Sequence, residues 1–180
     1  VNGGPSGVGI ATAAGKAAFW DMVGAADSPK IIAFEGEFAM TEGHAQELKT
    51  QALALSVGKR LRIVLSDNNA GIDDVLLGGV VPTRYKGYDL AEQWKSYGWN
   101  VLVVADGGDY QQIADMYAAM ENWDAADKRP MIAIAKTTKG CWPTAMDGKL
   151  GSVKQIVSYA SHPYSQKMNS EYFVALAESF

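Results

Sequence analysis

Four short apolar runs, rich in β-branched residues, recur along the chain without alternating between apolar and polar positions. They occupy residues 30–34, 61–65, 100–104 and 131–135. Runs of nearly continuous hydrophobicity are typical of strands that are covered on both faces, as in a parallel sheet. The pattern therefore predicts four strands of one mostly parallel sheet.

Segments with the spacing of amphipathic helices separate these runs. In the last of them, Ile113, Met116, Tyr117 and Met120 fall on one face. The predicted helices cover residues 8–23, 43–57, 90–97 and 110–123. Because strand and helix alternate, the sequence predicts an α/β fold with right-handed crossovers and helices on both faces of a mostly parallel sheet.

No internal repeat or linker interrupts this pattern before residue 136, after which glycines and prolines mark a loop. We interpret residues 1–140 as an α/β domain and residues 141–180 as an extended C-terminal segment of the same domain. The chain begins at Val1, inside a glycine-rich stretch, and stops inside a helix-like run. We therefore expect a piece of a longer chain, or one subunit of a split enzyme.

Composition narrows the class of protein. Sixteen Lys and Arg residues against 20 Asp and Glu residues give a net charge of −4, which argues against non-specific binding of nucleic acid. A single cysteine excludes an internal disulfide, and no Cys/His array offers a zinc site. No apolar run approaches the ~20 residues of a membrane span. We expect a soluble, cytoplasmic domain that does not enter a membrane.

Polar loops follow three of the predicted strands, at residues 35–43, 66–74 and 136–140. Ligands of open parallel sheets bind beyond the carboxyl ends of the strands. Carboxylates and amides there suit Mg²⁺, and the helix that begins near Gly43 offers free N–H groups to a diphosphate. Ordinary loops that close strands and cap helices would show the same residues, so this pattern alone leaves both interpretations open.

The order of several short motifs resembles the thiamine-diphosphate-binding domain of the transketolase family. A glycine turn (residues 4–9, GPSGVG) is followed by GEF at residues 36–38 and EG at residues 42–43. After these come DNN at 67–69, ID at 72–73, YGWNV at 97–101, DGGDY at 106–110, DKRP at 127–130 and KTTKG at 136–140. The resemblance lies in the ordered set, which covers roughly residues 3–140.

The resemblance implies a site for thiamine diphosphate and Mg²⁺. It assigns the metal to Glu37, Asn68 and the backbone carbonyl of Ala70. It places Gly36 and Phe38 against the diphosphate and Ile72 near the thiazolium ring. The glycine turn, with Gly4 and Gly7, would line the cofactor pocket and a dimer interface.

Two residues depart from the family pattern. Glu37 stands where the family has aspartate and is one methylene longer, and Phe38 stands where the family has glycine. A benzyl group at this point obstructs the close approach of backbone to phosphate that glycine allows. Cofactor binding is therefore expected to be weakened or lost unless the loop bends differently.

The implied activity is transfer of a two-carbon ketol unit between sugar phosphates. Decarboxylation of a 2-oxo acid and a non-catalytic assembly subunit are the alternatives. His162 lies where the family carries a histidine that contacts diphosphate and substrate, whereas His44 is expected to have a polar role at a helix start. The activating glutamate of the family belongs to a pyrimidine-binding domain, so we expect a homo-oligomer, a partner chain with that domain, or both.

Overall fold

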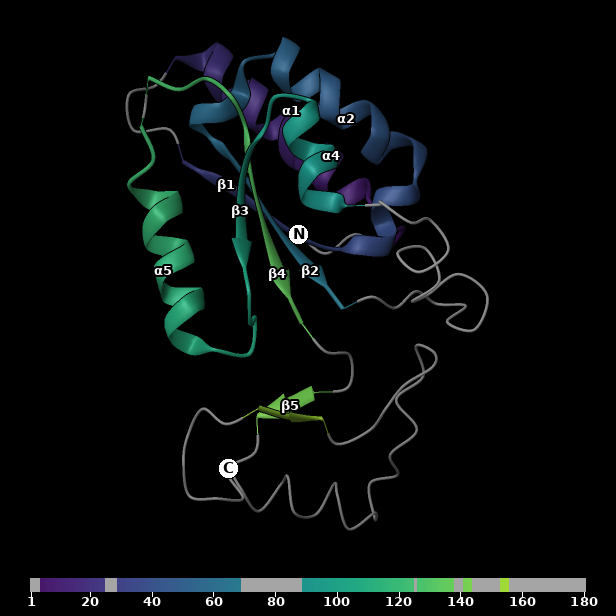
Figure 1. Cartoon of the computed structure of the whole chain (residues 1–180). Helices are drawn as coiled ribbons and strands as arrows, with labels where there is room; N and C mark the ends of the chain where they lie inside the picture. Colours follow the sequence, from purple (N-terminus) through teal and green to yellow (C-terminus); the bar gives the residue numbers. More distant parts are fainter. Residues whose placement is uncertain are drawn as a thin grey trace.

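A parallel four-stranded sheet forms the centre of the computed structural model, which describes residues 4–24, 29–68, 89–124, 126–137, 141–143 and 153–155. The sheet contains β1 (Ile31–Gly36), β2 (Leu61–Asp67), β3 (Asn100–Val104) and β4 (Met131–Lys136), in the order β1-β2-β4-β3 (Figure 1). All three pairings are parallel. The predicted strands and fold class are confirmed.

Helices cover both faces of the sheet, as predicted. Helices α1 (Val8–Val23), α2 (Gly43–Ala54) and α4 (Leu90–Ser96) lie on one face, and α5 (Tyr110–Glu121) lies on the other (Figure 1). The first face buries the larger core, in which Ile63 and Ile132 meet the helices. On the second face, Met116 and Met120 of α5 pack against Val104 and the small residues of β4.

Local signals explain where the helices begin and end. Asp89 accepts a hydrogen bond from the Glu92 N–H at 3.0 Å and so caps the start of α4. The predicted helix over residues 43–57 is too long, because α2 ends at Ala54. Ser56 has a left-handed backbone (φ 53°), which breaks the helix before a short 3₁₀ turn, η2 (Val57–Lys59).

Helix α2 is joined to α4 by a buried lysine. The ammonium group of Lys49 donates to the side-chain oxygens of Gln46 (2.8 Å) and Gln93 (2.9 Å) and lies over the Trp94 and Tyr97 rings. Burial lowers the pKa of Lys49, because the charged form loses hydration. This contact fixes the position of α4 against the helix that begins at the carboxyl edge of the sheet.

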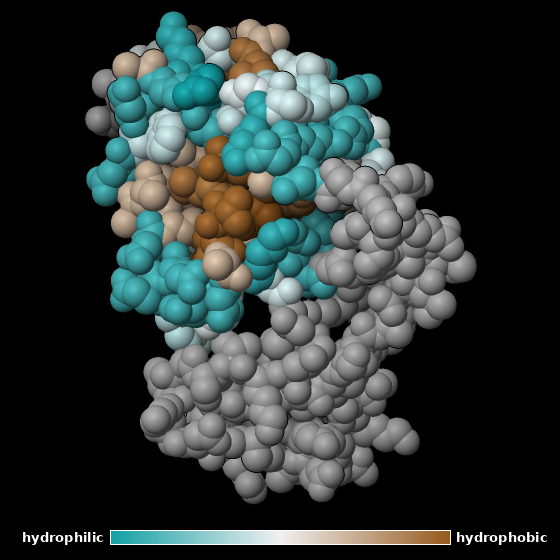
Figure 2. All heavy atoms as spheres, in the orientation of Figure 1, coloured by the Kyte–Doolittle hydropathy of each residue, from teal (hydrophilic) through white to brown (hydrophobic). Residues whose placement is uncertain are grey.

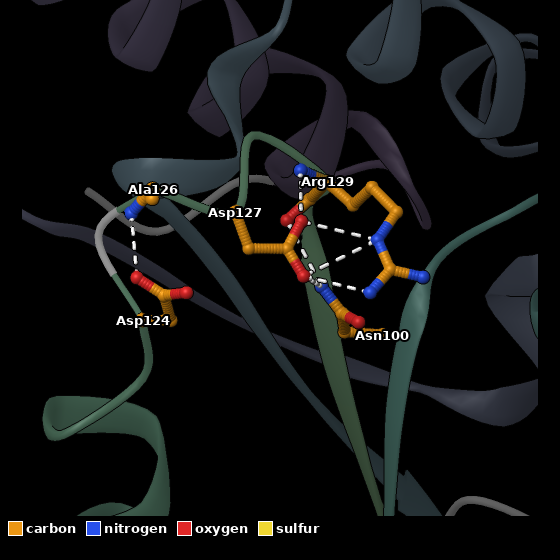
Figure 3. A network of polar contacts seen from close by, with 5 residues as sticks. All are labelled: Asn100, Asp124, Ala126, Asp127 and Arg129. Atoms are coloured by element: carbon orange, nitrogen blue, oxygen red, sulfur yellow. Dashed lines mark hydrogen bonds and ion pairs between the residues drawn. The ribbon is translucent and has the colours of Figure 1, made fainter.

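The amino-terminal edge of the sheet is held by a polar network (Figure 3). The Asn100 amide donates to the Asp127 carboxylate at 3.1 Å, and the Arg129 guanidinium pairs with the same carboxylate at 2.7 Å. Close by, the buried Arg62 donates to the carbonyl of Met120 in the last turn of α5. These contacts connect the starts of β3 and β4 with the end of α5. They lie at the edge of the sheet opposite to the predicted site.

Two further strands, β5 (Cys141–Pro143) and β6 (Val153–Gln155), pair antiparallel in a separate sheet. The proposed division of the chain near residue 140 stays a prediction. None of the helices in the described part of the chain is long and apolar enough to cross a membrane.

Candidate functional site at the carboxyl edge of the sheet

The loops expected to carry the site leave the sheet at one edge. Strands β1 and β2 run side by side, with Gly36 opposite Ser66, and β2 pairs with β4 so that Asp67 lies opposite Lys136. Because all strands are parallel, their carboxyl ends lie together. The three polar loops therefore leave the sheet at neighbouring points.

Glu37 and Phe38 come directly after β1, in the 3₁₀ helix η1 (Glu37–Thr41). The Thr41 hydroxyl donates to the carbonyl of Phe38 at 2.8 Å, and Ala39 and Met40 are buried beneath the turn. Gly36 itself has an ordinary extended backbone, and a Cβ added to it would meet nothing within 4 Å. The chain thus bends into η1 at the point where the family pattern has its second glycine.

Asn68 follows the end of β2, on the strand adjacent to the one that leads to Glu37. Each of these two residues has an interaction within the molecule. Among the described residues no group of three His, Cys, Asp or Glu side chains is placed to hold a metal ion. Ala70, Ile72 and His162 lie outside the described residues, so their assigned roles stay predictions.

The glycine turn packs against the same edge. Gly7 is buried and left-handed (φ 76°), and a Cβ there would lie 2.7 Å from Nε2 of His44 and 3.2 Å from the carbonyl of Ala39. Glycine is required here by both backbone conformation and space. The structure therefore brings Gly7, Gly36, Glu37 and Phe38 to one place.

A cavity of about 610 Å³ opens beside this turn. It is bounded by the start of α1 and by β1, and Gly4 lies at its rim with Pro5 and Ser6. Glu35 contributes a carboxylate to the lining, and Lys16 contributes a cation from within α1. Val8, Ile32 and Phe34 contribute apolar walls to it.

A polar cluster joins the ends of β2 and β4 and was not among the predicted site residues. Lys136 forms an ion pair with Asp67, and the hydroxyls of Ser66 and Thr137 lie 2.9 Å apart. The backbone N–H of Thr137 donates to the carbonyl of Asp67 at 2.9 Å. These residues lie in two of the polar loops that the sequence pointed to, at residues 66–74 and 136–140, although none of them was assigned a role as a ligand.

The DGGD turn after β3 reaches the same edge. Gly107 donates its N–H to the carbonyl of Lys136 at 2.7 Å, and a Cβ on Gly107 would lie 2.6 Å from the Thr137 methyl group. Asp109 caps α5 by accepting hydrogen bonds from the N–H groups of Gln111 and Gln112. These hydrogen bonds, those from Gln112 foremost, hold the pKa of Asp109 below its usual value. This turn therefore begins α5 and packs on β4.

The fold and the loops at its carboxyl edge define an α/β domain of the kind that binds a cofactor at its strand ends. The family model described as "Transketolase, thiamine diphosphate binding domain" matches residues 1–153. The chain belongs to this family.

Curated relatives agree with this assignment. The chain is 34% identical over 145 residues to a transketolase of Geobacillus stearothermophilus and 32% identical over 145 residues to one of Streptococcus pyogenes serotype M6. Each comparison covers 76% of this chain, but only 20% of the Geobacillus protein and 18% of the Streptococcus protein. The chain thus spans about a fifth of the length of these relatives.

Solved structures show the same fold. A transketolase from Leishmania mexicana superposes with a TM-score of 0.59 at 24% identity, over 78% of this chain and 21% of that one. A transketolase from Campylobacter jejuni gives a TM-score of 0.56 at 21% identity, over 73% and 19% of the two chains. At these identities the likeness concerns the fold alone.

Proposed function

We propose that this chain is the part of a transketolase-type enzyme that holds the diphosphate of thiamine diphosphate through Mg²⁺. One observation carries the proposal. The glycine turn, the end of β1, the η1 turn and the residue after β2 converge at the carboxyl edge of the sheet. The family to which the chain belongs supports the choice of cofactor.

The residues at this edge fit a hard cation. Glu37 offers a carboxylate and Asn68 an amide oxygen, each directly after one of two neighbouring parallel strands. Oxygen donors of this kind suit Mg²⁺, which retains positions for water and phosphate oxygens. In the proposal, the carbonyl of Ala70 supplies a third protein ligand.

The remaining residues would bind and orient the organic part of the cofactor. Gly36 and Phe38 lie against the diphosphate in this proposal, Ile72 lies near the thiazolium ring, and Gly4 and Gly7 line the pocket. When bound, thiamine diphosphate supplies the carbanion chemistry by which a ketol unit is transferred. The chain fixes the diphosphate, and His162 contacts diphosphate and substrate.

The substrates in this proposal are sugar phosphates, and the chain by itself is inactive. The activating glutamate belongs to a pyrimidine-binding domain in the family pattern. We therefore propose that activity needs that domain, from a partner chain or from the rest of a longer protein, in a homo-oligomer or a complex. The cytoplasmic location stays a prediction.

The η1 turn favours weak binding of the cofactor. Phe38 is half-buried at the turn and follows the longer carboxylate of Glu37. A side chain at this position occupies space where the family pattern has only backbone. A non-catalytic assembly subunit, in which these two changes have closed the site, is the competing function.

Calorimetric titration tests the proposal. Thiamine diphosphate should bind the unmodified chain only with Mg²⁺ present. Asn68→Ala should abolish binding, because an octahedral ion then loses one of few protein ligands. Phe38→Gly combined with Glu37→Asp should strengthen binding, since both the space and the carboxylate length of the family pattern are restored.

Asn122→Ala, which changes an exposed asparagine at the end of α5, is the matched control and should leave binding unchanged. Failure of the unmodified chain to bind, with binding restored in the Phe38→Gly, Glu37→Asp variant, would favour the assembly subunit. Failure of both would contradict the proposed function. Tight binding that needs neither Mg²⁺ nor Asn68 would show that the metal site has been placed wrongly.

A further inference from the structure

The glycine turn leads into α1 without a side-chain cap among the described residues. Gly7 occupies the N-cap position of α1, where a side-chain oxygen normally accepts a backbone N–H. The first turn of α1 also contains no acidic residue. Ordering a segment rich in glycine costs conformational entropy for each residue that is fixed. Contacts from elsewhere in the fold must therefore supply what the local sequence lacks.

Glu35 supplies one of these contacts from the end of β1. Its Oε2 atom accepts a hydrogen bond from the Gly7 N–H at 2.9 Å, and its Oε1 atom accepts one from the Gly36 N–H at 3.2 Å. The carboxylate is half-buried, and the same Oε2 lies 3.8 Å from where a Cβ of Gly9 would stand. A negative charge at the start of a helix is favourable, and a charged acceptor strengthens the bond.

His44 supplies the second contact from the start of α2. Its Nε2 lies 2.8 Å from the carbonyl oxygen of Ser6, and because a carbonyl only accepts, this ring nitrogen donates. The ring approaches so closely because Gly7 has no side chain. Glu35 and His44 thus hold the turn from two elements that also lead into the proposed diphosphate site.

We propose that Glu35 and His44 are positioning residues that fix the glycine turn in the conformation needed to receive the cofactor. This inference rests on the proposed function. Neither side chain contacts the cofactor in the proposal. They act through the backbone of Ser6 and Gly7. Their effect on binding is preorganisation, because the entropy of ordering the turn is already lost in the free protein and is not lost again when the ligand binds.

The test compares Glu35→Leu and Glu35→Gln with Glu47→Leu, a matched control at an exposed position of α2. Two quantities are measured on the full chain: hydrogen exchange of the Gly7 amide by NMR without ligand, and the Kd for thiamine diphosphate with Mg²⁺. Glu35→Leu should raise both the exchange rate and the Kd by about tenfold or more. Glu35→Gln retains an acceptor oxygen and should recover part of each loss, and Glu47→Leu should change neither.

His44→Leu provides an independent variant and should also raise the Kd, through loss of the bond to Ser6. Unchanged Gly7 exchange in Glu35→Leu, or faster exchange with an unchanged Kd, would overturn this inference alone. Absence of any binding by the unmodified chain would overturn the proposed function and, with it, the positioning role.

Discussion

A single carboxylate, Asp127, organises the network at the amino-terminal edge of the sheet. Its side chain is 17% exposed and accepts hydrogen bonds from the Arg129 side chain and backbone and from the Asn100 amide. The Arg129 guanidinium is the largest of the causes that hold the pKa of Asp127 far below its usual value. The ionised form is therefore bound more strongly in the folded protein than in the unfolded chain.

The lowered pKa of Asp127 makes part of the stability depend on pH. A carboxyl group with a depressed folded-state pKa stabilises the fold above its unfolded pKa, and this stabilisation is lost as pH falls toward the folded-state value. Asp127→Asn should therefore lower the free energy of unfolding at pH 7. On acidification to about pH 3, the free energy of unfolding of this variant should fall by less than that of the unmodified protein. Urea denaturation at both pH values measures the difference.

Asp115→Asn is the control for this comparison, because Asp115 is exposed on α5 and bonds only to the neighbouring Gln111 among its described contacts. The Asp115→Asn variant should lose as much stability on acidification as the unmodified protein does. Equal acid sensitivity in Asp127→Asn and the unmodified chain would show that the network carries no such linkage.

At the scale of an element, the short η2 turn depends on one glycine. Gly58 is buried, and its N–H donates to the carbonyl of Lys128 at 3.0 Å. A Cβ at this position would lie 2.2 Å from backbone atoms of Lys128 and Arg129. Backbone cannot move aside as the end of a flexible side chain can. The turn and the segment before β4 therefore pack as closely as two backbones allow.

Gly58→Ala should destabilise the fold by about 1–3 kcal/mol or more, because the added methyl group overpacks a buried contact. Gly15→Ala is the matched substitution. Gly15 is exposed inside α1 with nothing within 4 Å of a Cβ position, so alanine there should stabilise the protein by about 0.5–1 kcal/mol. Chemical denaturation of the two variants gives both values. Equal effects at the two glycines would contradict the close contact at η2.

The strands were predictable because burial on both faces leaves a continuous apolar run. All four predicted runs became strands, with ends displaced by two residues or fewer. The end of α2 was not predictable in the same way, since Leu53 and Leu55 continue the helical pattern. The left-handed conformation of Ser56 terminates the helix, and this depends on tertiary contacts around η2.

The candidate site was predictable in its location but only partly in its contacts. Strand ends and family motifs pointed to Gly7, Gly36 and Glu37, which the structure brings to one edge. The bonds of Glu35 to Gly7 and of His44 to Ser6 join residues 28 and 38 positions apart. Such contacts leave no periodic signal in a single sequence. A glutamate or a histidine in a sequence does not indicate which backbone group it will contact, because the fold determines that contact.

At the scale of the whole molecule, α1 and β3 leave apolar surface uncovered by the described residues. Helix α1 is largely apolar around its circumference, and Phe19, Met22 and Val23 are 55%, 83% and 52% exposed. Figure 2 shows a second apolar area over β3, where Val103 is 52% exposed. A helix that is apolar all round is normally buried. We therefore predict that the chain self-associates through α1.

Self-association through α1 is testable by analytical ultracentrifugation. The unmodified chain should sediment as a dimer at ~100 µM, and Met22→Glu should shift it toward the monomer, because a buried charge without a partner is costly. Tyr117→Glu, at an exposed aromatic position on α5, should leave the dimer intact. A strictly monomeric unmodified chain would rule out this interface.

The strand order also has a consequence for how the protein emerges from a ribosome. Strand β4 lies between β2 and β3, although β3 is made first. Strands β1 and β2 can pair as soon as both have left the exit tunnel, but the segment NVLVV of β3 has no neighbour in this sheet until residues 131–136 follow it. For that interval an apolar and uncharged segment stays unpaired, which is the kind of segment that aggregates. Protection of the nascent chain by chaperones should therefore matter most between the synthesis of β3 and that of β4.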